Sequence, residues 1–374
     1  MIESREGLRP TIVEVDQAAI RNNARRMKER FRDDVELIAV VKANGYGHGS
    51  AIVAEAAIEA GASMIAVATG EEALQMRKRH QEIPILILGP VPVTFIPKAA
   101  KYRITLTIPS VDWLERAVET YRDEPITVHL KIDSGMHRIG VETIEDVKRV
   151  EFLMDQSAFS LEGAFTHFAC ADEMDDTMTA VQKERFEMLV AALSERPRML
   201  HAANSAAASL YEDVTYDAVR VGFHLYGIPV APHVAAQLPF SLERALTVRT
   251  EVTRVSLLKK GESVSYGAKY VAPKDEWVAT LPIGYADGLR RALTGQDVLI
   301  RGKRQPIIGT ICMDQCLVRL DEPVSPGEPV ILIGKSETSG EEVTVEEWAN
   351  RLGTIPYEIC TSLSPRMHRR VKQS

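Results

Sequence analysis

The sequence predicts an α/β barrel of eight parallel strands, of the TIM type, followed by a mostly-β C-terminal domain. Two observations carry this prediction. Short apolar runs alternate with segments of helical spacing through the first 225 residues, and from about residue 235 the pattern changes to strand-like alternation with few helices. A chain of 374 residues also exceeds what one hydrophobic core usually serves, so we expect two domains, at 1–235 and 236–374.

Eight apolar runs, each bounded by polar or turn-forming residues, predict the strands of the barrel. They lie at Leu37–Val41, Met64–Val67, Ile85–Leu88, Ile104–Ile108, Ile126–Ile132, Leu161–Phe165, Met199–Ala203 and Ala218–Val221. Five intervening segments with apolar residues three and four apart predict helices, at Ser50–Glu59, Glu71–Arg79, Val111–Tyr121, Ile144–Leu153 and Met178–Leu193. An open doubly wound sheet shows the same alternation, but it rarely needs eight consecutive units.

The C-terminal part predicts strands separated by turn signals such as Lys260-Gly261-Glu262. These strands lie at Leu246–Val255, Trp277–Leu281, Asp297–Ile300, Cys316–Leu320 and Pro329–Ile333. Residues 11–15 form a further alternating run, placed before a helix that begins near Asp16. Because this run falls outside the eight of the barrel, we expect it to pair with the second domain.

The composition excludes several classes of protein. A net charge of −7 gives no basic surplus for nucleic acid, so a small molecule is the expected partner. No apolar run approaches a membrane span and the N-terminus has no export signal, so we expect no membrane contact and a cytoplasmic location. The four cysteines lack CxxC spacing, and we expect neither disulfides nor a metal site.

Lys42 is the first candidate for chemistry. It ends the apolar run 37–41 and opens a glycine-rich loop. Burial at the end of such a strand favours the neutral amine, which is a nucleophile or a base. The alternative is a lysine that closes a strand with its stem buried and its ammonium in water.

Other polar residues also follow predicted strands, and the carboxyl ends of barrel strands are where functional groups gather. These residues are Arg138 after the fifth strand, His167 after the sixth, Asn204 and Ser205 after the seventh, and Arg220 with Gly222 at the eighth. Loops after the seventh and eighth strands often hold phosphate. Taken singly, Asn204 is also typical of a helix cap, His167 of a core histidine and Arg220 of a surface ion pair.

Nine segments, in order and in both domains, resemble those of the bacterial alanine racemases. They are Ala39–Gly49, Lys131–Gly140, Thr166–Phe168 with Ala171–Asp172, His201–Ser205, Arg220–Gly222 with Leu225–Gly227, Val264–Gly267, Gly284–Gly288, Cys312–Asp314 and Pro356–Glu358. The resemblance implies pyridoxal 5′-phosphate as the cofactor, which supplies the electron sink that removal of an α-proton from an amino acid needs. It also implies the barrel followed by a β-domain.

The resemblance assigns the cofactor's contacts. It places the Schiff base on Lys42, and it places the phosphate at Tyr46, Ser205, Gly222, Phe223 and Tyr357, with His167 and Asn204 nearby. Tyr46 taken alone is more typical of a packing residue. Arg220 is implied to face the pyridine nitrogen. Because arginine keeps its own proton, this nitrogen should then stay unprotonated. Side reactions such as transamination should become less competitive as a result.

Racemisation needs a proton to leave one face of the α-carbon and another to arrive on the opposite face. The resemblance assigns these two roles to Lys42 and Tyr266, and it implies that Tyr266 reaches the active site of the other subunit of a homodimer. His167 and Arg220 are hypothesised to lower the pKa of the phenol. Arg138 is implied to bind the substrate carboxylate.

The remaining implied residues concern substrate choice. Met313 and Tyr285 are implied to wall in a small side chain, and Lys131 matches a position that is carbamylated in several relatives. The expected reaction is the interconversion of L-alanine and D-alanine, which supplies D-alanine for peptidoglycan.

Two alternatives to alanine racemisation use the same fold: a serine or broad-specificity racemase, and an amino-acid decarboxylase. Two residues argue against a decarboxylase: Tyr266, in the segment Ser265-Tyr266-Gly267, and Arg220. A non-catalytic pyridoxal-phosphate carrier keeps the barrel but lacks the β-domain, so the length of this chain argues against it.

Overall fold

The computed structural model describes residues 9–372, which form two compact units. The barrel unit contains Ala18–Gly45 and Val53–Glu243, and the β unit contains the described residues up to Gln17, Tyr46–Ile52 and those from Arg244 onward. The chain therefore passes between the units four times, the last time after Glu243, whereas the sequence pattern predicts one boundary at residue 235. Each unit is described by itself below.

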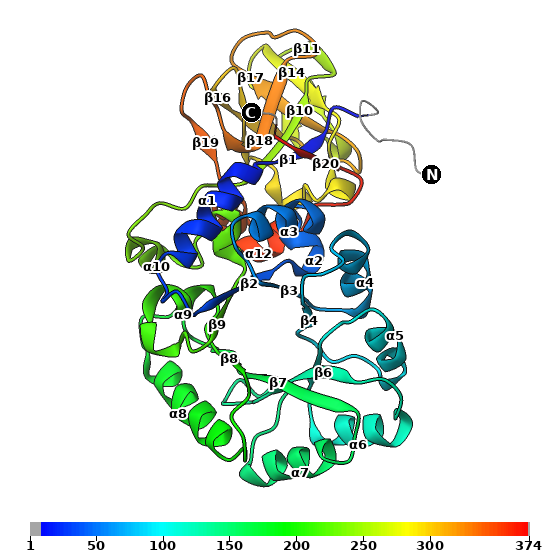
Figure 1. Cartoon of the computed structure of the whole chain (residues 1–374). Coiled ribbons are helices and arrows are strands. Elements are labelled where there is room, and N and C mark those ends of the chain that lie inside the picture. The colour runs from blue at the N-terminus through cyan, green and yellow to red at the C-terminus, as the bar shows by residue number, and fades with distance from the viewer. Residues whose placement is uncertain (1–8, 373–374) are drawn as a thin grey trace. The chain divides into compact units, whose positions relative to one another are not determined.

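The barrel unit contains eight parallel strands in two four-stranded sheets, with the orders β4-β3-β2-β9 and β5-β6-β7-β8 (Figure 1). The strands are β2 (Glu36–Val40), β3 (Met64–Val67), β4 (Ile85–Ile87), β5 (Leu106–Ile108), β6 (Ile126–Lys131), β7 (Phe159–Phe165), β8 (Met199–His201) and β9 (Ala218–Val221). Backbone hydrogen bonds from the Ile87 N–H to the Thr105 oxygen (3.0 Å) and from the Arg220 N–H to the Ala203 oxygen (3.0 Å) join the two sheets at both edges. The predicted eight-stranded barrel is confirmed.

Helices surround the strands of the barrel unit in Figure 1. They are α1 (Gln17–Lys28), α3 (Ser50–Glu59), α4 (Gly70–Arg79), α5 (Ile96–Lys101), α6 (Val111–Thr120), α7 (Ile144–Met154), α8 (Thr177–Ala191), α9 (Ser205–Leu210) and α10 (Pro232–Ala236), with short 3-10 turns η1 (Val93–Phe95), η2 (Glu212–Val214) and η3 (Phe223–Tyr226). Thr69, Ser110 and Thr143 cap α4, α6 and α7 by accepting a backbone N–H three residues on. These caps start the helices within one residue of the predicted positions.

The strands of the barrel unit are buried over nearly their whole length, as expected for a parallel sheet covered by helices. Several polar side chains lie among these strands. Thr107, His129, Lys131, His201 and Arg220 are all buried. Because buried polar groups need partners, this set fixes much of the geometry of the site described below.

The β unit is built on one sheet, whose order in residues 9–372 is β11-β14-β17-β16-β15-β18-β10-β1-β20, with β19 beside β18. Its strands are β1 (Ile12–Val15), β10 (Leu246–Glu251), β11 (Arg254–Leu258), β14 (Glu276–Leu281), β15 (Asp297–Ile300), β16 (Lys303–Ile308), β17 (Cys316–Leu320), β18 (Pro329–Lys335), β19 (Glu342–Val343) and β20 (His368–Val371). The strands β12 (Ser263–Val264) and β13 (Tyr270–Val271) form a separate hairpin, next to η4 (Tyr266–Ala268).

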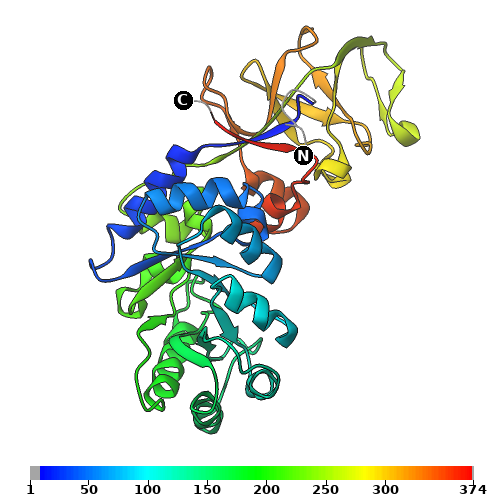
Figure 2. The same cartoon turned by 45° about the vertical axis from the view of Figure 1, so that its right-hand side comes forward.

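Strand β1 pairs antiparallel with β10 and parallel with β20, so it lies between the first strand after the barrel and the last strand of the described chain. Figure 2 shows the blue β1 beside the red β20. The run 11–15 therefore belongs to the sheet of the β unit.

Two features of the β unit differ from the sequence prediction. The single strand predicted at 246–255 is two strands, because at Val252 and Thr253 the backbone turns from one partner to another: the Val252 N–H bonds Glu328 and the Thr253 N–H bonds Thr280. The sequence analysis also missed β16, which contains Pro306, and the helices α11 (Val345–Leu352) and α12 (Pro356–Ser362). Among the described residues, no helix is both long and apolar enough to cross a membrane.

Candidate active site

The carboxyl ends of the barrel strands bring together the basic residues predicted from the sequence. Lys42 begins the segment that follows β2, and Arg138, His167 and Arg220 come from the ends of three other strands. Burial, then Arg138, then Arg220 lower the pKa of Lys42, and Glu72 opposes them. The amine is therefore biased toward its neutral, nucleophilic form, as the sequence analysis expects of a lysine in this position.

The chain leaves β2 through a left-handed turn within α2 (Lys42–Tyr46). Ala43, Asn44 and Gly45 have φ values of 52°, 54° and 61°, and Tyr46 has a φ of 48°. A left-handed conformation costs a non-glycine residue about 1–2 kcal/mol, so it persists only where the surroundings hold it. The Gly45 N–H bonds the Val41 oxygen (2.8 Å), and the Ala43 N–H bonds Oε1 of Glu72 (2.6 Å).

Arg220 is buried inside the barrel, which rules out the surface ion pair considered above. Its Nη2 donates to the backbone oxygens of Thr166 (2.7 Å) and Ala202 (2.9 Å) and to Nδ1 of His167 (3.3 Å). Its Nη1 donates to the oxygen and to Nδ1 of His201. Burial lowers the pKa of Arg220 to about 9, so the guanidinium keeps its charge at neutral pH.

Two buried histidines continue this network into the barrel. Because Nδ1 of His201 accepts from Arg220, the proton of the neutral ring is on Nε2, which donates to Nδ1 of His129 (2.7 Å). His129 then donates from Nε2 to Glu162 (3.2 Å). Burial lowers the pKa of both histidines, which agrees with neutral rings. A Cβ at Gly163 would lie 2.7 Å from the His129 ring, so only glycine at this position leaves room for it.

His167 is held in a defined tautomer by the same arginine. Burial and then Arg220 hold the pKa of His167 well below its usual range, so its ring is neutral. Its Nδ1 accepts from Arg220, and its proton is therefore on Nε2. His167 is therefore a neutral N–H donor whose ring is fixed by Arg220. The sequence alone suggests only a histidine of the core.

Lys131 lies at the end of β6 and is buried. Burial lowers its pKa to about 7, against the opposing effect of Asp133. Its Nζ donates to the Ile132 oxygen (2.6 Å) and lies 5.6 Å from the centre of the Phe165 ring. A substantial fraction of this amine is therefore neutral near pH 7.

Arg138 lies on a loop organised by Asp133. The buried Asp133 carboxylate accepts the backbone N–H groups of Gly135 (2.9 Å), His137 (3.0 Å) and Arg138 (2.9 Å). Arg138 itself is exposed, and within residues 9–372 its guanidinium makes no hydrogen bond or ion pair. A cation positioned by its backbone in this way is available to an external carboxylate.

Residues after β8 and β9 supply polar groups near the ends of those strands. Asn204 caps α9, because its Oδ1 accepts the Ala207 N–H (3.0 Å). Ser205 accepts the Gly222 N–H on its Oγ (3.0 Å), which ties the two loops together. Phe223 follows in η3 and is buried.

The predicted residues of the β unit fall into two groups. Tyr46 and Tyr357 pack edge to face, with ring centres 6.0 Å apart. Tyr266, Tyr285 and Met313 are instead exposed, at 72%, 42% and 53% of their surface. The backbone of Tyr266 is held by the Thr310 hydroxyl (2.9 Å) and follows Ser265, which has a φ of 64°.

The loops that carry Tyr285 and Met313 are bonded to each other. The Tyr285 N–H bonds the Cys312 oxygen (3.0 Å) and the Ala286 N–H bonds the Met313 oxygen (3.0 Å). A Cβ at Gly284 would lie 2.3 Å from both of these oxygens, so the close approach requires glycine.

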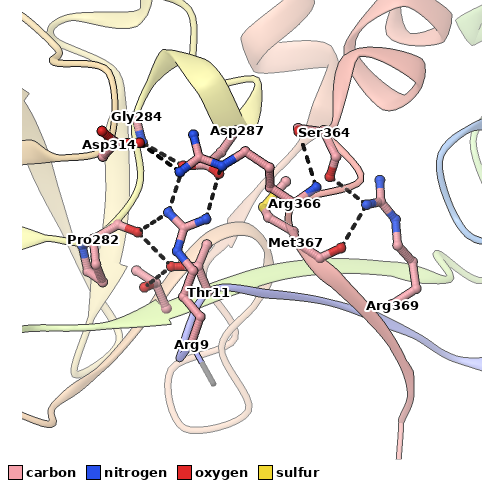
Figure 3. Close-up of polar contacts among 11 residues, drawn as sticks. Arg9, Thr11, Pro282, Gly284, Asp287, Asp314, Ser364, Arg366, Met367 and Arg369 are labelled. Carbon is pink, nitrogen blue, oxygen red and sulfur yellow. Dashed lines mark hydrogen bonds and ion pairs between the residues drawn. The ribbon is translucent and has the colours of Figure 1, made fainter. Parts of the chain in front are cut away.

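Asp287 anchors the same loops. Figure 3 shows its carboxylate between Arg9 and Arg366. It accepts hydrogen bonds from both terminal nitrogens of Arg9 (2.6 and 2.7 Å) and from the Gly284 N–H (3.0 Å). Burial alone would raise the pKa of this carboxyl, but the bonds from Arg9 and Gly284 outweigh burial and the pKa is lowered.

Sequence reasoning missed several of these residues. Glu72, His129 and Asp287 act through other groups and lie outside the strand ends. One signal was present: Thr69 followed by Glu72 is the pattern of a capping box.

An eight-stranded parallel barrel with basic side chains at its strand ends, followed by a β-sheet unit, defines the class of two-domain barrel enzymes. The chain belongs to the alanine racemase family. It matches "Alanine racemase, N-terminal domain" over residues 15–230 and "Alanine racemase, C-terminal domain" over residues 245–371. The predicted family, fold class and enzyme class are confirmed: the chain is an amino-acid racemase, and the family depends on pyridoxal 5′-phosphate.

Named relatives and solved structures agree with this assignment. The chain is 44% identical over 362 residues to alanine racemase 1 of Bacillus subtilis, covering 96% of this chain and 92% of the relative. Among solved structures, alanine racemase from Bacillus anthracis with bound L-Ala-P has a TM-score of 0.94 at 39% identity, covering 97% and 95% of the two chains. A histidine racemase from Leuconostoc mesenteroides has a TM-score of 0.91 at 30% identity, covering 98% and 99%.

The bonding of Asp287 predicts a large effect of a nearly isosteric change. Asp287→Asn removes the charge that faces Arg9 and leaves an amide in place of a carboxylate oxygen, so we expect the β unit to lose about 2–4 kcal/mol of unfolding free energy. Peptide-resolved hydrogen exchange measures this loss for the β unit separately. Asp314→Asn is the control, because Asp314 also pairs with Arg366 (2.7 Å) but is 56% exposed and should matter by less than about 1 kcal/mol. Equal effects of the two substitutions would contradict this account of Asp287.

Proposed function

We propose that this chain interconverts L-alanine and D-alanine with pyridoxal 5′-phosphate and two proton-transferring residues, Lys42 and Tyr266, and so supplies D-alanine for peptidoglycan. One observation carries the proposal: Arg138, Arg220 and Lys42 are close enough for the two arginines to lower the pKa of the lysine. Such a concentration of positive charge suits a ligand with anionic groups, such as a phosphate and a carboxylate.

The residues of the barrel unit fit the cofactor. Lys42 would hold it covalently, and Arg220 would face its pyridine nitrogen. Ser205, Gly222 and Phe223 would bind the phosphate from the loops after β8 and β9, with Asn204 close by. Tyr46 and Tyr357, which belong to the β unit, are the further phosphate-binding residues of this proposal. When bound, pyridoxal phosphate withdraws electrons from the α-carbon of an attached amino acid and so makes its proton removable.

Two residues would move the proton. The neutral amine of Lys42 takes a proton from one face of the α-carbon, or returns it there. The hydroxyl of Tyr266 does so on the other face. His167 keeps a donor proton on Nε2, the atom that its bond to Arg220 leaves protonated.

Substrate choice would depend on three residues. The unpaired guanidinium of Arg138 would bind the substrate carboxylate with two hydrogen bonds. Tyr285 and Met313 would limit the side chain, and exclusion of one or two methylene groups contributes only about 1–3 kcal/mol. Some turnover of serine fits this proposal, and the fold alone leaves the choice open because a histidine racemase shares it.

The exposure of Tyr266 supports a homodimer with shared active sites. A tyrosine that is 72% exposed, on a turn with a left-handed serine before it, is held outward at a cost in backbone strain. We expect a second copy of the chain to bury this side chain at the dimer interface. The expected location of the dimer is the cytoplasm.

The first test is the cofactor and the reaction together. Wild-type protein should bind pyridoxal phosphate with a yellow absorbance and convert either enantiomer of alanine, as measured by chiral chromatography. Lys42→Ala should lose the absorbance and the conversion, because it removes the amine that is proposed to hold the cofactor covalently. Tyr266→Phe should keep the absorbance and exchange the α-proton of only one enantiomer with deuterated water. Equal loss of exchange from both enantiomers would refute the assignment of faces.

The second test is complementation between two inactive variants. Mixed dimers of Lys42→Ala with Tyr266→Phe contain one site with both residues intact, so random mixing should restore about a quarter of the wild-type activity if sites are shared. The mixing is done by unfolding and refolding the two variants together, and differently tagged chains confirm that mixed dimers form. Mixed dimers without activity would show that both residues act from one chain.

The third test concerns Lys131. With a pKa of about 7 its neutral amine can add to carbon dioxide, giving a carbamate and releasing one proton, and the negative carbamate would then attract Arg138 instead of repelling it. We expect 13C-labelled bicarbonate to give a carbamate signal in the wild type that is absent in Lys131→Ala. The alternative, an unmodified lysine, predicts no labelled signal at any bicarbonate concentration.

A further inference from the structure

Glu72 joins the ends of two neighbouring strands of the barrel. Its Oε1 accepts the Ala43 N–H (2.6 Å), just past β2, and its Oε2 accepts the Ala68 N–H (2.8 Å), just past β3. Each carboxylate oxygen therefore has its own backbone donor. All of these residues belong to the barrel unit.

This use of Glu72 departs from the ordinary role of its position. Glu72 is the third residue of α4, and Thr69 caps that helix by accepting the Glu72 N–H (3.3 Å). In a capping box the glutamate at this position would reach back to the N–H of the cap residue itself. Here its carboxylate instead accepts the N–H groups of Ala68 and Ala43. The second bond of a capping box, from the N–H of Thr69 to the glutamate, is replaced by a bond to another segment.

The bond to Ala43 acts directly on Lys42. The Ala43 N–H belongs to the planar peptide group whose other end is the Cα of Lys42, so fixing this N–H fixes the plane from which the lysine side chain departs. It also holds the first residue of the left-handed turn at 43–46, which the chain does not adopt without support.

We propose that Glu72 is a positioning residue for Lys42: its carboxylate holds the left-handed turn so that the amine points to the cofactor and remains there when the covalent bond to the cofactor is exchanged. The inference rests on the proposed role of Lys42. Glu72 lies in the first turn of α4, where the helix dipole favours a negative charge.

Glu72 has a second, electrostatic effect on the same amine. It is the one anion among the groups that shift the pKa of Lys42, and it raises that pKa where burial and the arginines lower it. The geometric and electrostatic effects can be separated by substitution. Glu72→Asp keeps the charge but is one methylene too short to bond both N–H groups, while Glu72→Gln keeps the length and loses the charge and one acceptor.

The experiment measures cofactor binding by the apoenzyme without any amino acid. Pyridoxal phosphate is titrated into wild type, Glu72→Gln, Glu72→Asp and the control Glu71→Gln, and the yellow absorbance gives the dissociation constant. Glu71 is the exposed neighbour on the same helix turn, so the control carries the same charge change. Loss of one charge-assisted hydrogen bond should weaken binding about ten- to hundredfold in both Glu72 variants and leave Glu71→Gln within about twofold of wild type.

Two further readouts distinguish positioning from a general loss of structure. Hydrogen exchange of the peptide that contains residues 42–47 should speed up in both Glu72 variants and stay slow in the control. The pH at which Lys42 reacts with pyridoxal phosphate should fall in Glu72→Gln, because the charge is lost, and remain near that of wild type in Glu72→Asp.

The outcome separates this inference from the proposed function. If Lys42→Ala abolishes the absorbance while Glu72→Gln binds pyridoxal phosphate as tightly as Glu71→Gln, the function stands and the role of Glu72 is refuted. If wild type itself forms no covalent bond with the cofactor at Lys42, the proposed function fails first.

Discussion

The buried guanidinium of Arg220 is the constraint on which the polar interior of the barrel unit depends. A charge in the interior is tolerated only when its donors are satisfied, and here they are met by backbone oxygens at the ends of β7 and β8 and by the rings of His167 and His201. Those two rings must be neutral to accept, and each is thereby left with a proton on Nε2. The tautomer of His201 in turn demands an acceptor, which His129 provides, and Gly163 makes room for that ring. One buried cation on β9 thus constrains residues on or next to three other strands, β6, β7 and β8.

The same cation also shapes the chemistry of its neighbours. Arg220 and Arg138 disfavour a charged amine at Lys42, and Arg220 disfavours one at Lys131. Burial acts in the same direction on both lysines. Glu72 opposes this effect at Lys42, and Asp133 opposes it at Lys131. Each lysine therefore has one carboxylate that opposes the effect of the arginines on its pKa. Each of these carboxylates is itself held by hydrogen bonds from backbone N–H groups.

Sequence reasoning predicted the barrel and its eight strands because parallel strands that are buried on both faces leave uninterrupted apolar runs, as at Met64–Val67. It also predicted that Lys42, Arg138 and Arg220 lie at or after the ends of strands, since this can be read from position alone. It failed where a residue's role depends on contacts distant in the chain. Asp287 meets Arg9 across 278 residues, and nothing local in either segment marks that bond. In the β unit, the split of the predicted strand 246–255 depends on which neighbours its two halves find, which local alternation does not encode.

Under the proposed function, reaction and substrate range depend on different parts of the chain. The barrel unit carries groups that act on what every amino acid shares: Lys42 at the α-carbon and Arg138 at the carboxylate. The residues that would limit the side chain, Tyr285 and Met313, lie on two loops of the β unit that Gly284 and Asp287 hold together. Replacing residues on those loops leaves the buried network of Arg220 untouched, because none of its bonds involves the β unit. A solved histidine racemase has a TM-score of 0.91 to this chain, so this fold also serves a racemase that is named for a larger amino acid.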